Sequence, residues 1–523
     1  MSSVPNASNN SKPRLEIPPN NPTEPRWLLD LDDWVVRAYS RIRFHKDPKN
    51  REYGYGIISY TWGKYWNRTD TVPEKDAPDG IDWKIPRLAK DAISLDEAKK
   101  VITSMGKRYV WWDWMCVPQG GSHKDIAEQE IGKQMAIYKN AKASIIWLHG
   151  TNWTQSSDVG QFLRNHYPER PLRQWLQNFS NGLQRIRERE PWLTSIWTLQ
   201  EGVLLNHSRL VDRHGARLPD VPKDKRFHSN EATVVDLAIV PAKLARDIAM
   251  ALFTGEGNPD PLFRDFTSVR ENRVYAQQIL CEIIRSGLFG YYDNPVPLTI
   301  LAGKGSRRYD KATNPDQYWA LIGALDLKVA PNYKLTIQKA RENFFKDLLE
   351  KYQWNLLLAP SLPLDISRRS WPEVIADGHI LPLDDLFFIS ELVDRLPQLS
   401  WTGTETGGPI IIGGAGGAPF KVFRLKKTGQ FRRYIQARNK QGQDLVDVLG
   451  PATEAPVEDA TYLHIAKLQP KSGLPGKRCI EMRGYQRGGA GQFNGVVDLW
   501  VSENDVALES ISKITLHLPQ KSL

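Results

Sequence analysis

The pattern of hydrophobic and polar positions predicts alternating strands and helices in the first part of the chain. Short apolar or aromatic runs predict three strands, at residues 55–60, 108–113 and 143–148. Apolar residues recur at helical spacing in three further segments, at residues 91–105, at residues 127–138 and around Trp197. This alternation is typical of an α/β fold with a parallel sheet and helices on both faces.

Five successive units follow from the same pattern. Residues 1–26 are rich in Asn, Pro and Ser and are expected to form a disordered tail. Leu28, Leu31 and Val35 share a helical spacing, which predicts an amphipathic helix in residues 27–50. The α/β domain follows at residues 51–215, and a mainly helical region at residues 216–395. The last unit, at residues 396–523, is small, glycine-dense and β-rich.

Polar and aromatic residues stand where the predicted strands end. Tyr60 and Trp62 follow the first strand, and Asp113 and Trp114 follow the second. Ligands of open parallel sheets bind beyond the carboxyl ends of the strands, so these side chains are expected to line one crevice. Their aromatic rings could stack on a nicotinamide or adenine ring. The alternative is that each tryptophan is a packing anchor in the core.

A carboxylate follows a tryptophan by one helical turn in the segment at residues 195–201. At 3.6 residues per turn, Trp197 and Glu201 lie on one face of the predicted helix. A carboxylate in a partly apolar cleft is a candidate catalytic group, because its charge can stabilise an oxocarbenium ion. The alternative is a solvated carboxylate on the surface of a helix.

The charge of the chain leaves several partners open. The net charge of +10 permits an anionic partner such as a nucleotide, a nucleic acid or an acidic membrane. The 70 basic and 60 acidic residues are intermixed, however, and zinc-finger, RNP-like and basic-zipper patterns are absent from the sequence. A mixed solvated surface is therefore favoured, and binding to nucleic acid rests on the charge alone.

Cysteine usage and hydropathy indicate the compartment. Three widely separated cysteines suit a reducing environment and exclude a disulfide framework. The sequence has no apolar signal segment at its start and no run of about 18 apolar residues. We therefore expect a cytoplasmic protein with no membrane span.

Other motifs carry weaker signals. No metal is expected, because the sequence has no ligands at metal-binding spacing, and no Gly-x-Ser-x-Gly motif supports a serine hydrolase. Cys116 is either a thiol nucleophile or a buried structural cysteine, and the latter is favoured. Two glycine stretches, residues 413–418 and 303–306, could cradle a phosphate, but both lack the ending of a P-loop, so flexible loops are favoured.

Residues 53–215 resemble the heterokaryon-incompatibility (HET) domain of filamentous fungi. Residues 58–63 read ISYTWG, like the family's LSYCWG, and residues 109–119 read YVWWDWMCVPQ, like YLWIDSLCIIQ. Residues 135–141 continue the second block, and residues 197–201 read WTLQE, as in the family. The chain departs from the family at Thr61 and Trp114 and in a long polar insertion at residues 65–83.

The resemblance implies a flavodoxin-like sheet, because HET domains are similar to TIR domains. Several TIR domains cleave NAD at the nicotinamide glycosidic bond with a glutamate in a Trp-x-x-x-Glu arrangement, which Trp197 and Glu201 share. Glu201 would then be the catalytic carboxylate, with NAD as the substrate and no cofactor. The substrate-binding residues would be Tyr60, Trp62, Asp113, Trp114 and Trp197.

The resemblance also implies non-self recognition that leads to cell death, with self-association or a partner protein. In the alternative interpretation, the domain is a non-catalytic adaptor. The function would then depend on its mobile, exposed BB-type loop, in the region of residues 113–121, with Gln119 and Lys124, instead of Glu201.

Overall fold

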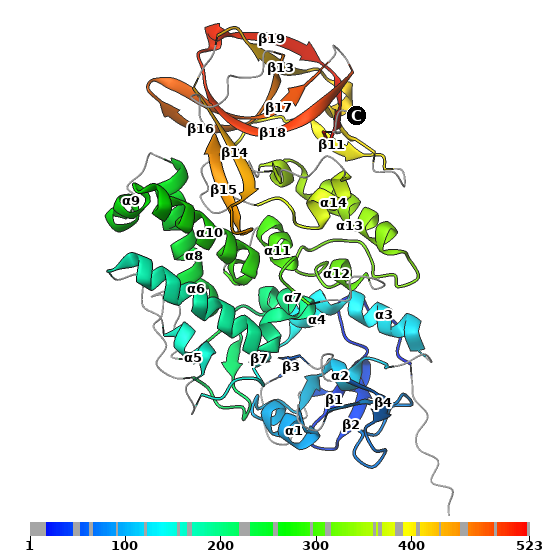
Figure 1. Cartoon of the computed structure of the whole chain (residues 1–523). Helices are drawn as coiled ribbons and strands as arrows, with labels where there is room; N and C mark the ends of the chain where they lie inside the picture. Colours follow the sequence, from blue (N-terminus) through cyan, green and yellow to red (C-terminus); the bar gives the residue numbers. More distant parts are fainter. Residues whose placement is uncertain are drawn as a thin grey trace, which may run out of the picture.

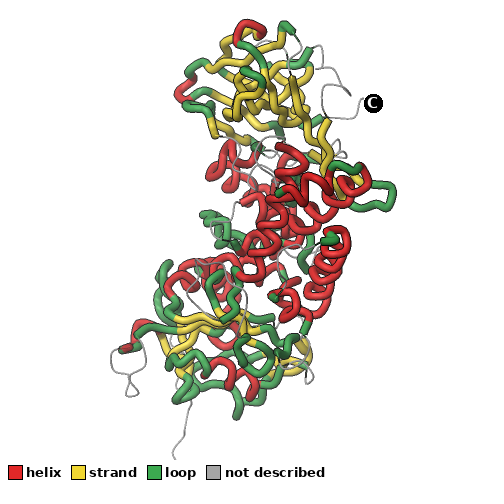
Figure 2. Tube along the Cα trace, turned by 90° about the vertical axis from the view of Figure 1, so that its left-hand side faces the viewer, coloured by secondary structure: helices red, strands yellow, loops and turns green. Residues whose placement is uncertain are grey.

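The computed structural model arranges the chain in three tiers, a sheet with its helices, a helical middle and a β-rich end (Figure 1). Figure 2 shows the same order and places helices above and below the first sheet. The structure describes residues 17–44, 53–61, 66–89, 93–119, 123–153, 157–164, 170–218, 231–254, 260–292, 297–308, 315–358, 362–363, 369–381, 391–403, 408–427, 430–449, 459–485 and 489–519.

The first tier is built on a six-stranded sheet in the order β2-β1-β6-β3-β7-β8. Its four parallel strands are β6 (Tyr109–Trp111), β3 (Gly56–Ser59), β7 (Ala143–Trp147) and β8 (Arg209–Val211). The first three match the strands predicted from the sequence, and the parallel pairing confirms the expected α/β class. Ile57 and Ile146 are almost completely buried, as expected of strands covered on both faces.

Seven helices are described in this tier. They are α1 (Leu95–Thr103), α2 (Asp113–Cys116), α3 (Lys124–Gly132), α4 (Gln134–Asn140), α5 (Asp158–Leu163), α6 (Leu172–Arg189) and α7 (Ile196–Leu204). Ser94 begins α1 with a capping box to Glu97, which satisfies backbone N–H groups at the start of the helix. Helices are present where the sequence predicts them at residues 91–105 and around Trp197. The single helix predicted at residues 127–138 is instead two helices, α3 and α4, with a break at Lys133.

The amphipathic helix predicted within residues 27–50 is wrong. The structure has an antiparallel hairpin there, β1 (Trp27–Asp30) and β2 (Val35–Ala38), which extends the sheet beyond β6. Trp34 has a left-handed backbone (φ 53°), which closes the turn and is incompatible with a continuing helix. The helical spacing of the apolar residues is coincidental, because all four residues of β1 are buried.

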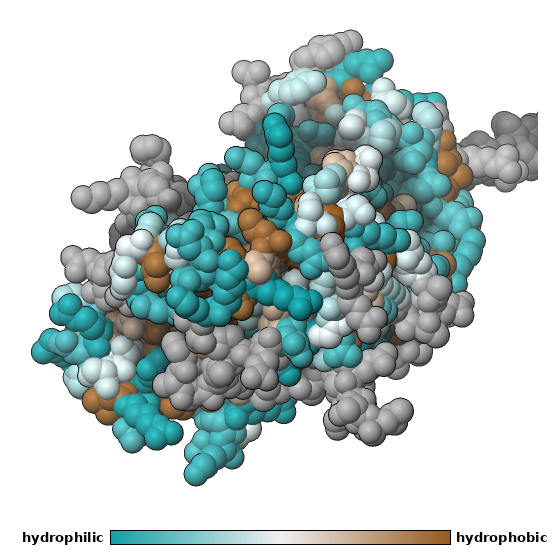
Figure 3. Space-filling view, turned by 90° about the horizontal axis from the view of Figure 1, so that it is seen from above, coloured by the Kyte–Doolittle hydropathy of each residue, from teal (hydrophilic) through white to brown (hydrophobic). Residues whose placement is uncertain are grey.

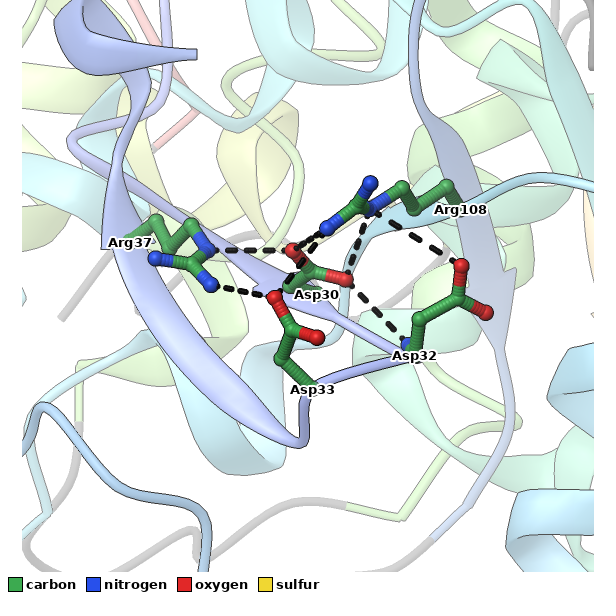
Figure 4. Close-up of polar contacts among 5 residues, drawn as sticks. All are labelled: Asp30, Asp32, Asp33, Arg37 and Arg108. Carbon is green, nitrogen blue, oxygen red and sulfur yellow. Dashed lines mark hydrogen bonds and ion pairs between the residues drawn. The ribbon is translucent and has the colours of Figure 1, made fainter. Parts of the chain in front are cut away.

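A charged cluster fixes this hairpin to the start of β6 (Figure 4). The fully buried carboxylate of Asp30 accepts hydrogen bonds from Arg108, with Nη2 at 2.7 Å and Nε at 3.0 Å, and from Nε of Arg37 at 3.0 Å. Asp33 pairs with both arginines at the exposed side of the cluster. Burial raises the pKa of Asp30, but the hydrogen bonds from Arg108 and Arg37 outweigh it, so the pKa is lowered.

The segment before the hairpin packs on helices α3 and α4. Arg26 is buried and its Nε lies 3.2 Å from the fully buried carboxylate of Glu130, which also pairs with Lys133 at 2.6 Å. Lys133 and Asn140 donate to the carbonyl oxygens of Glu24 and Thr23. Of the predicted disordered tail, residues 1–16 lie outside the described residues, whereas Thr23, Glu24 and Arg26 hold its last part against the domain through these contacts.

Helices make up the middle tier. They are α8 (Asp236–Ala249), α9 (Pro261–Thr267), α10 (Arg270–Ser286), α11 (Pro297–Lys304), α12 (Asp316–Trp319), α13 (Ile337–Tyr352) and α14 (Trp371–Ala376). Thr336 caps α13 by accepting from the N–H of Lys339. None of the helices in the described part of the chain is long and apolar enough to cross a membrane.

The last tier is a second sheet with mostly antiparallel pairing. Its strands are β9 (Leu362–Pro363), β10 (Glu391–Leu392), β11 (Gln398–Trp401), β12 (Ile410–Gly413), β13 (Phe420–Leu425), β14 (Gln430–Arg438), β15 (Asp444–Leu449), β16 (Thr461–Lys471), β17 (Leu474–Arg483), β18 (Ala490–Trp500), β19 (Val506–Ile511) and β20 (Lys513–His517). This sheet confirms the predicted β-rich C-terminal region. From above, this end presents a largely hydrophilic surface with scattered apolar residues (Figure 3).

The glycine stretch at residues 413–418 connects β12 to β13. It contains a short 3₁₀ turn, Ala415–Gly417, and residues 415–418 are exposed. A phosphate cradle of the P-loop type lies between a strand and a helix, whereas this loop joins two strands. The loop interpretation of this stretch is therefore confirmed.

The Asp30 cluster gives a stability prediction. Replacing Asp30 by Asn should lower the free energy of unfolding at pH 7 by about 3 kcal/mol, because two guanidinium groups lose their buried partner. The pKa of Asp30 is lowered in the folded state, so its contribution is fully present above the unfolded pKa of about 4 and is lost progressively as the pH falls from there through the folded pKa. Urea unfolding at pH 7 measures the loss of stability in the variant, and the difference from the wild type should decrease progressively at pH 3.5 and below.

Asp33→Asn is the matched control for this experiment. Asp33 contacts the same arginines but its side chain is 49% exposed, so its loss should cost less than about 1 kcal/mol. Equal losses in the two variants would contradict the assignment of the buried carboxylate as the anchor.

Candidate functional site

Four segments converge on the carboxyl group of Glu201. Glu201 lies in α7, Ser59 ends β3, Asp113 follows β6, and Tyr138 lies in α4. Ser59 donates a hydrogen bond to Oε2 of Glu201, and both Asp113 and Tyr138 act on the same carboxyl group. The predicted convergence of strand ends with the Trp197 helix is thus present for Asp113 and Glu201.

A chain of hydrogen bonds holds this carboxyl group. Nε1 of Trp192 donates to Oγ of Ser59 at 2.8 Å. Since the serine oxygen accepts that proton, its own hydroxyl proton is directed to Glu201. Trp192 lies in the 3₁₀ turn Pro191–Thr194, directly before α7, and is fully buried. The carboxyl group is therefore oriented by a serine that a buried indole orients in turn.

Burial dominates the electrostatics of Glu201. Its residue exposure is 7%, so the interpretation as a solvated surface carboxylate is wrong. Desolvation is the largest effect and raises the pKa of Glu201, and the negative charge of Asp113 raises it further. The hydrogen bonds with Ser59 and Tyr138 lower it, and the resulting pKa is about 8. At neutral pH the carboxyl group is mostly protonated and uncharged.

Tyr60 is fixed on two sides at the end of β3. Its hydroxyl accepts from Nε1 of Trp112 at 2.7 Å, and its ring stacks on Trp147 with centroids 5.9 Å apart. Burial, together with the nearby Asp113, holds the pKa of Tyr60 well above its usual value. Tyr60 is 5% exposed and belongs to the buried core.

The predicted tryptophans have different positions. Trp114 is buried and its Nε1 donates to the carbonyl of Pro86 at 2.9 Å, in the hairpin of β4 (Trp66–Thr71) and β5 (Pro86–Leu88). Trp114 therefore anchors this hairpin to α2. Its indole N–H already has a hydrogen-bond partner within the protein. Trp197 is half-buried and packs against the core. Trp62 lies outside the described residues.

Two further sequence hypotheses can be compared with this region. Cys116 is fully buried and burial raises its pKa to about 12, which confirms a structural cysteine rather than a thiol nucleophile. The segment predicted as the BB-type loop begins with the short helix α2, in which Met115 is also fully buried. Of the residues assigned to that loop, 120 and 121 lie outside the described part.

Three residues of the site, Ser59, Tyr138 and Trp192, are not among the candidates that the sequence indicates. Ser59 and Tyr138 lie within segments that resemble the HET family, residues 58–63 and 135–141, and this resemblance is the one sequence signal for them. Trp192 is brought to Ser59 by packing between segments 133 residues apart, which local spacing cannot indicate.

Helix α7 is also held by the helical middle of the chain. Oε1 of the buried Gln200 accepts from the N–H groups of Gly323 and Ala324, at 2.6 and 3.3 Å. A Cβ atom at position 323 would lie only 2.7 Å from that oxygen, so a side chain there would force Gln200 to shift. The position of Glu201 thus depends on residues well outside the α/β domain.

Comparisons with known proteins support one family. Residues 55–201 match the family model described as heterokaryon incompatibility protein (HET), and the matched region ends at Glu201. No curated protein and no solved structure matches the chain. The match confirms the resemblance predicted from the sequence blocks, and the assignment to a TIR-like superfamily stays a prediction.

The raised pKa of Glu201 predicts how stability depends on pH. Between the ordinary value of 4.5 and about 8, the folded state holds a proton that the unfolded state has lost. Wild-type stability should therefore fall as the pH rises through this window, by up to about 5 kcal/mol. Glu201→Gln should remove this slope, which urea unfolding at pH 5.5 and 8.5 measures.

Glu342→Gln serves as the control, because Glu342 is a buried glutamate of α13, outside the matched region. That variant should keep the wild-type slope. The same slope in Glu201→Gln and the wild type would show that Glu201 titrates at an ordinary pKa.

Proposed function

We propose that this chain acts in a heterokaryon incompatibility response leading to cell death, and that Glu201 cleaves the nicotinamide–ribose bond of NAD. The match of residues 55–201 to the HET family supports the role. The observation that carries the chemistry is an enclosed carboxyl group of raised pKa beside Asp113, where parallel strands end. Carboxyl groups perturbed by burial and a like charge are typical of active sites.

The proposed reaction is hydrolysis. The bond from ribose C1′ to the nicotinamide nitrogen breaks with its electron pair on the nitrogen, and a water oxygen bonds to C1′. The products are nicotinamide, ADP-ribose and a proton. Ionised Glu201 would stabilise the positive charge that develops on the ribose, as carboxylates do in glycoside hydrolysis. Trp197 and Asp113, which are only half-buried, would border the substrate.

Substrate must reach a carboxyl group that is 7% exposed. The proposal therefore requires the contacts around Glu201 to open when NAD binds. A bound nicotinamide carries a positive charge, which favours ionisation of the neighbouring carboxyl group. Binding and activation of Glu201 would then be coupled.

A second candidate function is a non-catalytic module that self-associates or binds a partner protein. The enclosure of Glu201 favours this second candidate, because a buried carboxyl group that is hydrogen-bonded to Ser59 and Tyr138 can hold the strand and the helices together without taking part in a reaction. In this case, Glu201→Gln would keep the ability to trigger cell death.

Nicotinamide release from NAD by the purified full chain tests the proposal. Glu201→Gln should lower turnover by about 10²–10³-fold, because it removes the charge that stabilises the ribosyl cation. For the wild type, kcat/KM should rise with pH towards about 8, as the free carboxyl group ionises. Glu342→Gln should leave both the rate and the profile unchanged.

Two outcomes would contradict NAD cleavage. One is the absence of turnover by the wild type at any concentration, and the other is full turnover by Glu201→Gln. If cells that express Glu201→Gln still die, the non-catalytic candidate is favoured.

A further inference from the structure

The end of α11 and the residues after it contain an unusual buried cation. The Gly-Lys-Gly-Ser stretch, residues 303–306, which the sequence offers as a weak candidate for a phosphate cradle, is not a loop throughout, because its first two residues end α11. Lys304 is not available for that role, since its buried Nζ donates to Asp377 at 3.0 Å and to the carbonyl of Ala376 at 2.9 Å. The next basic residue along the chain, Arg307, has no such acidic partner among the described residues.

Arg307 is 3% exposed, yet much of its guanidinium group is unsatisfied. Nη2 donates to the hydroxyl of Tyr291 at 2.9 Å and lies 3.4 Å from the carbonyl oxygen of Ser286. Nε and Nη1 are buried and have no hydrogen-bond partner. Neutral oxygens on one nitrogen do not compensate a full positive charge in the interior, which normally requires an anion.

A second guanidinium group lies beside it. Arg187 of α6 donates from Nη2 to the carbonyl of Ser306 at 3.0 Å, and its buried Nε has no partner. Desolvation and the charge of Arg307 lower the pKa of Arg187, whereas Glu282 raises it. Glu282 lies beyond ion-pair distance of both arginines and accepts a hydrogen bond from Ser180. Two buried or half-buried cations thus share one region without a paired carboxylate among the described residues.

We propose that Arg307 and Arg187 form a binding site for a phosphoryl group. Planar guanidinium groups bind phosphate oxygens through paired, charge-assisted hydrogen bonds, and the three unsatisfied N–H positions supply such donors. A phosphoryl group carries up to two negative charges and so matches two arginines better than a carboxylate does. Arg187 is half-buried, so it is the more accessible of the two arginines.

The proposed phosphoryl site is separate from Glu201, but it contacts α7, the helix that carries Glu201. Tyr291, whose hydroxyl accepts from Arg307, packs its ring directly on Gly202, the residue after Glu201. The ligand is either free phosphate or a nucleotide phosphate. The proposal does not rest on NAD cleavage, because it concerns binding alone.

Thermal unfolding of the full chain tests the site in phosphate-free buffer at constant ionic strength. Inorganic phosphate, and separately ADP-ribose, should raise the wild-type Tm by a few degrees, whereas sodium chloride should not. Arg307→Gln should abolish the rise and, without phosphate, should have a Tm equal to or above that of the wild type, since an uncompensated charge is removed. Arg187→Gln, at a half-buried position, should weaken phosphate binding at least about tenfold.

Arg185→Gln is the matched control, on the same helix but 51% exposed and paired with Asp158 at 3.4 Å. It should keep the wild-type response. A response to ADP-ribose alone assigns the site to a nucleotide, and a response to phosphate alone assigns it to the free anion. No wild-type response, or an equal response in all variants, would overturn the proposal, whatever the result for nicotinamide release.

Discussion

A carboxyl group can be buried only if it is protonated, hydrogen-bonded or paired, and Glu201 meets the first two conditions. Its neighbours come from β3, α2, α4 and the turn before α7, so the carboxyl group links the sheet to the helices above it. Ser59 and Trp192 define its orientation. The packing of this part of the molecule therefore depends on one ionisable group that is mostly uncharged at neutral pH.

Helix α7, which carries Glu201, connects the α/β tier to the helical middle tier. Gln200 accepts hydrogen bonds from the backbone at Gly323 and Ala324, and Gly202 packs on Tyr291. A change in the helical middle would thus be transmitted to Glu201 through the adjacent residues of α7. This arrangement gives the region outside the HET match a physical means of controlling the site, whether the site is catalytic or serves in assembly.

The alternation of strands and helices could be predicted from hydrophobic spacing, because burial on both faces leaves continuous apolar runs such as that of β7. The same spacing wrongly predicted a helix near the start of the chain. The apolar residues of β1 and β2 are separated by the turn at Trp34 in a way that coincides with helical spacing. The pairing of Trp197 and Glu201 on α7 was predictable from their local separation. The enclosure of Glu201 was not, because Ser59 and Tyr138 reach its carboxyl group, and Trp192 reaches Ser59, only through tertiary packing.

Difference infrared spectroscopy of the full chain, wild type minus Glu201→Gln, tests the central claim directly, because the carboxyl stretch reports the protonation of one group. The account predicts a protonated-carboxyl band at pH 6 that is lost with a midpoint near 8. A midpoint near the ordinary value of 4.5 would contradict it, since Glu201 would then be an ionised, solvated side chain.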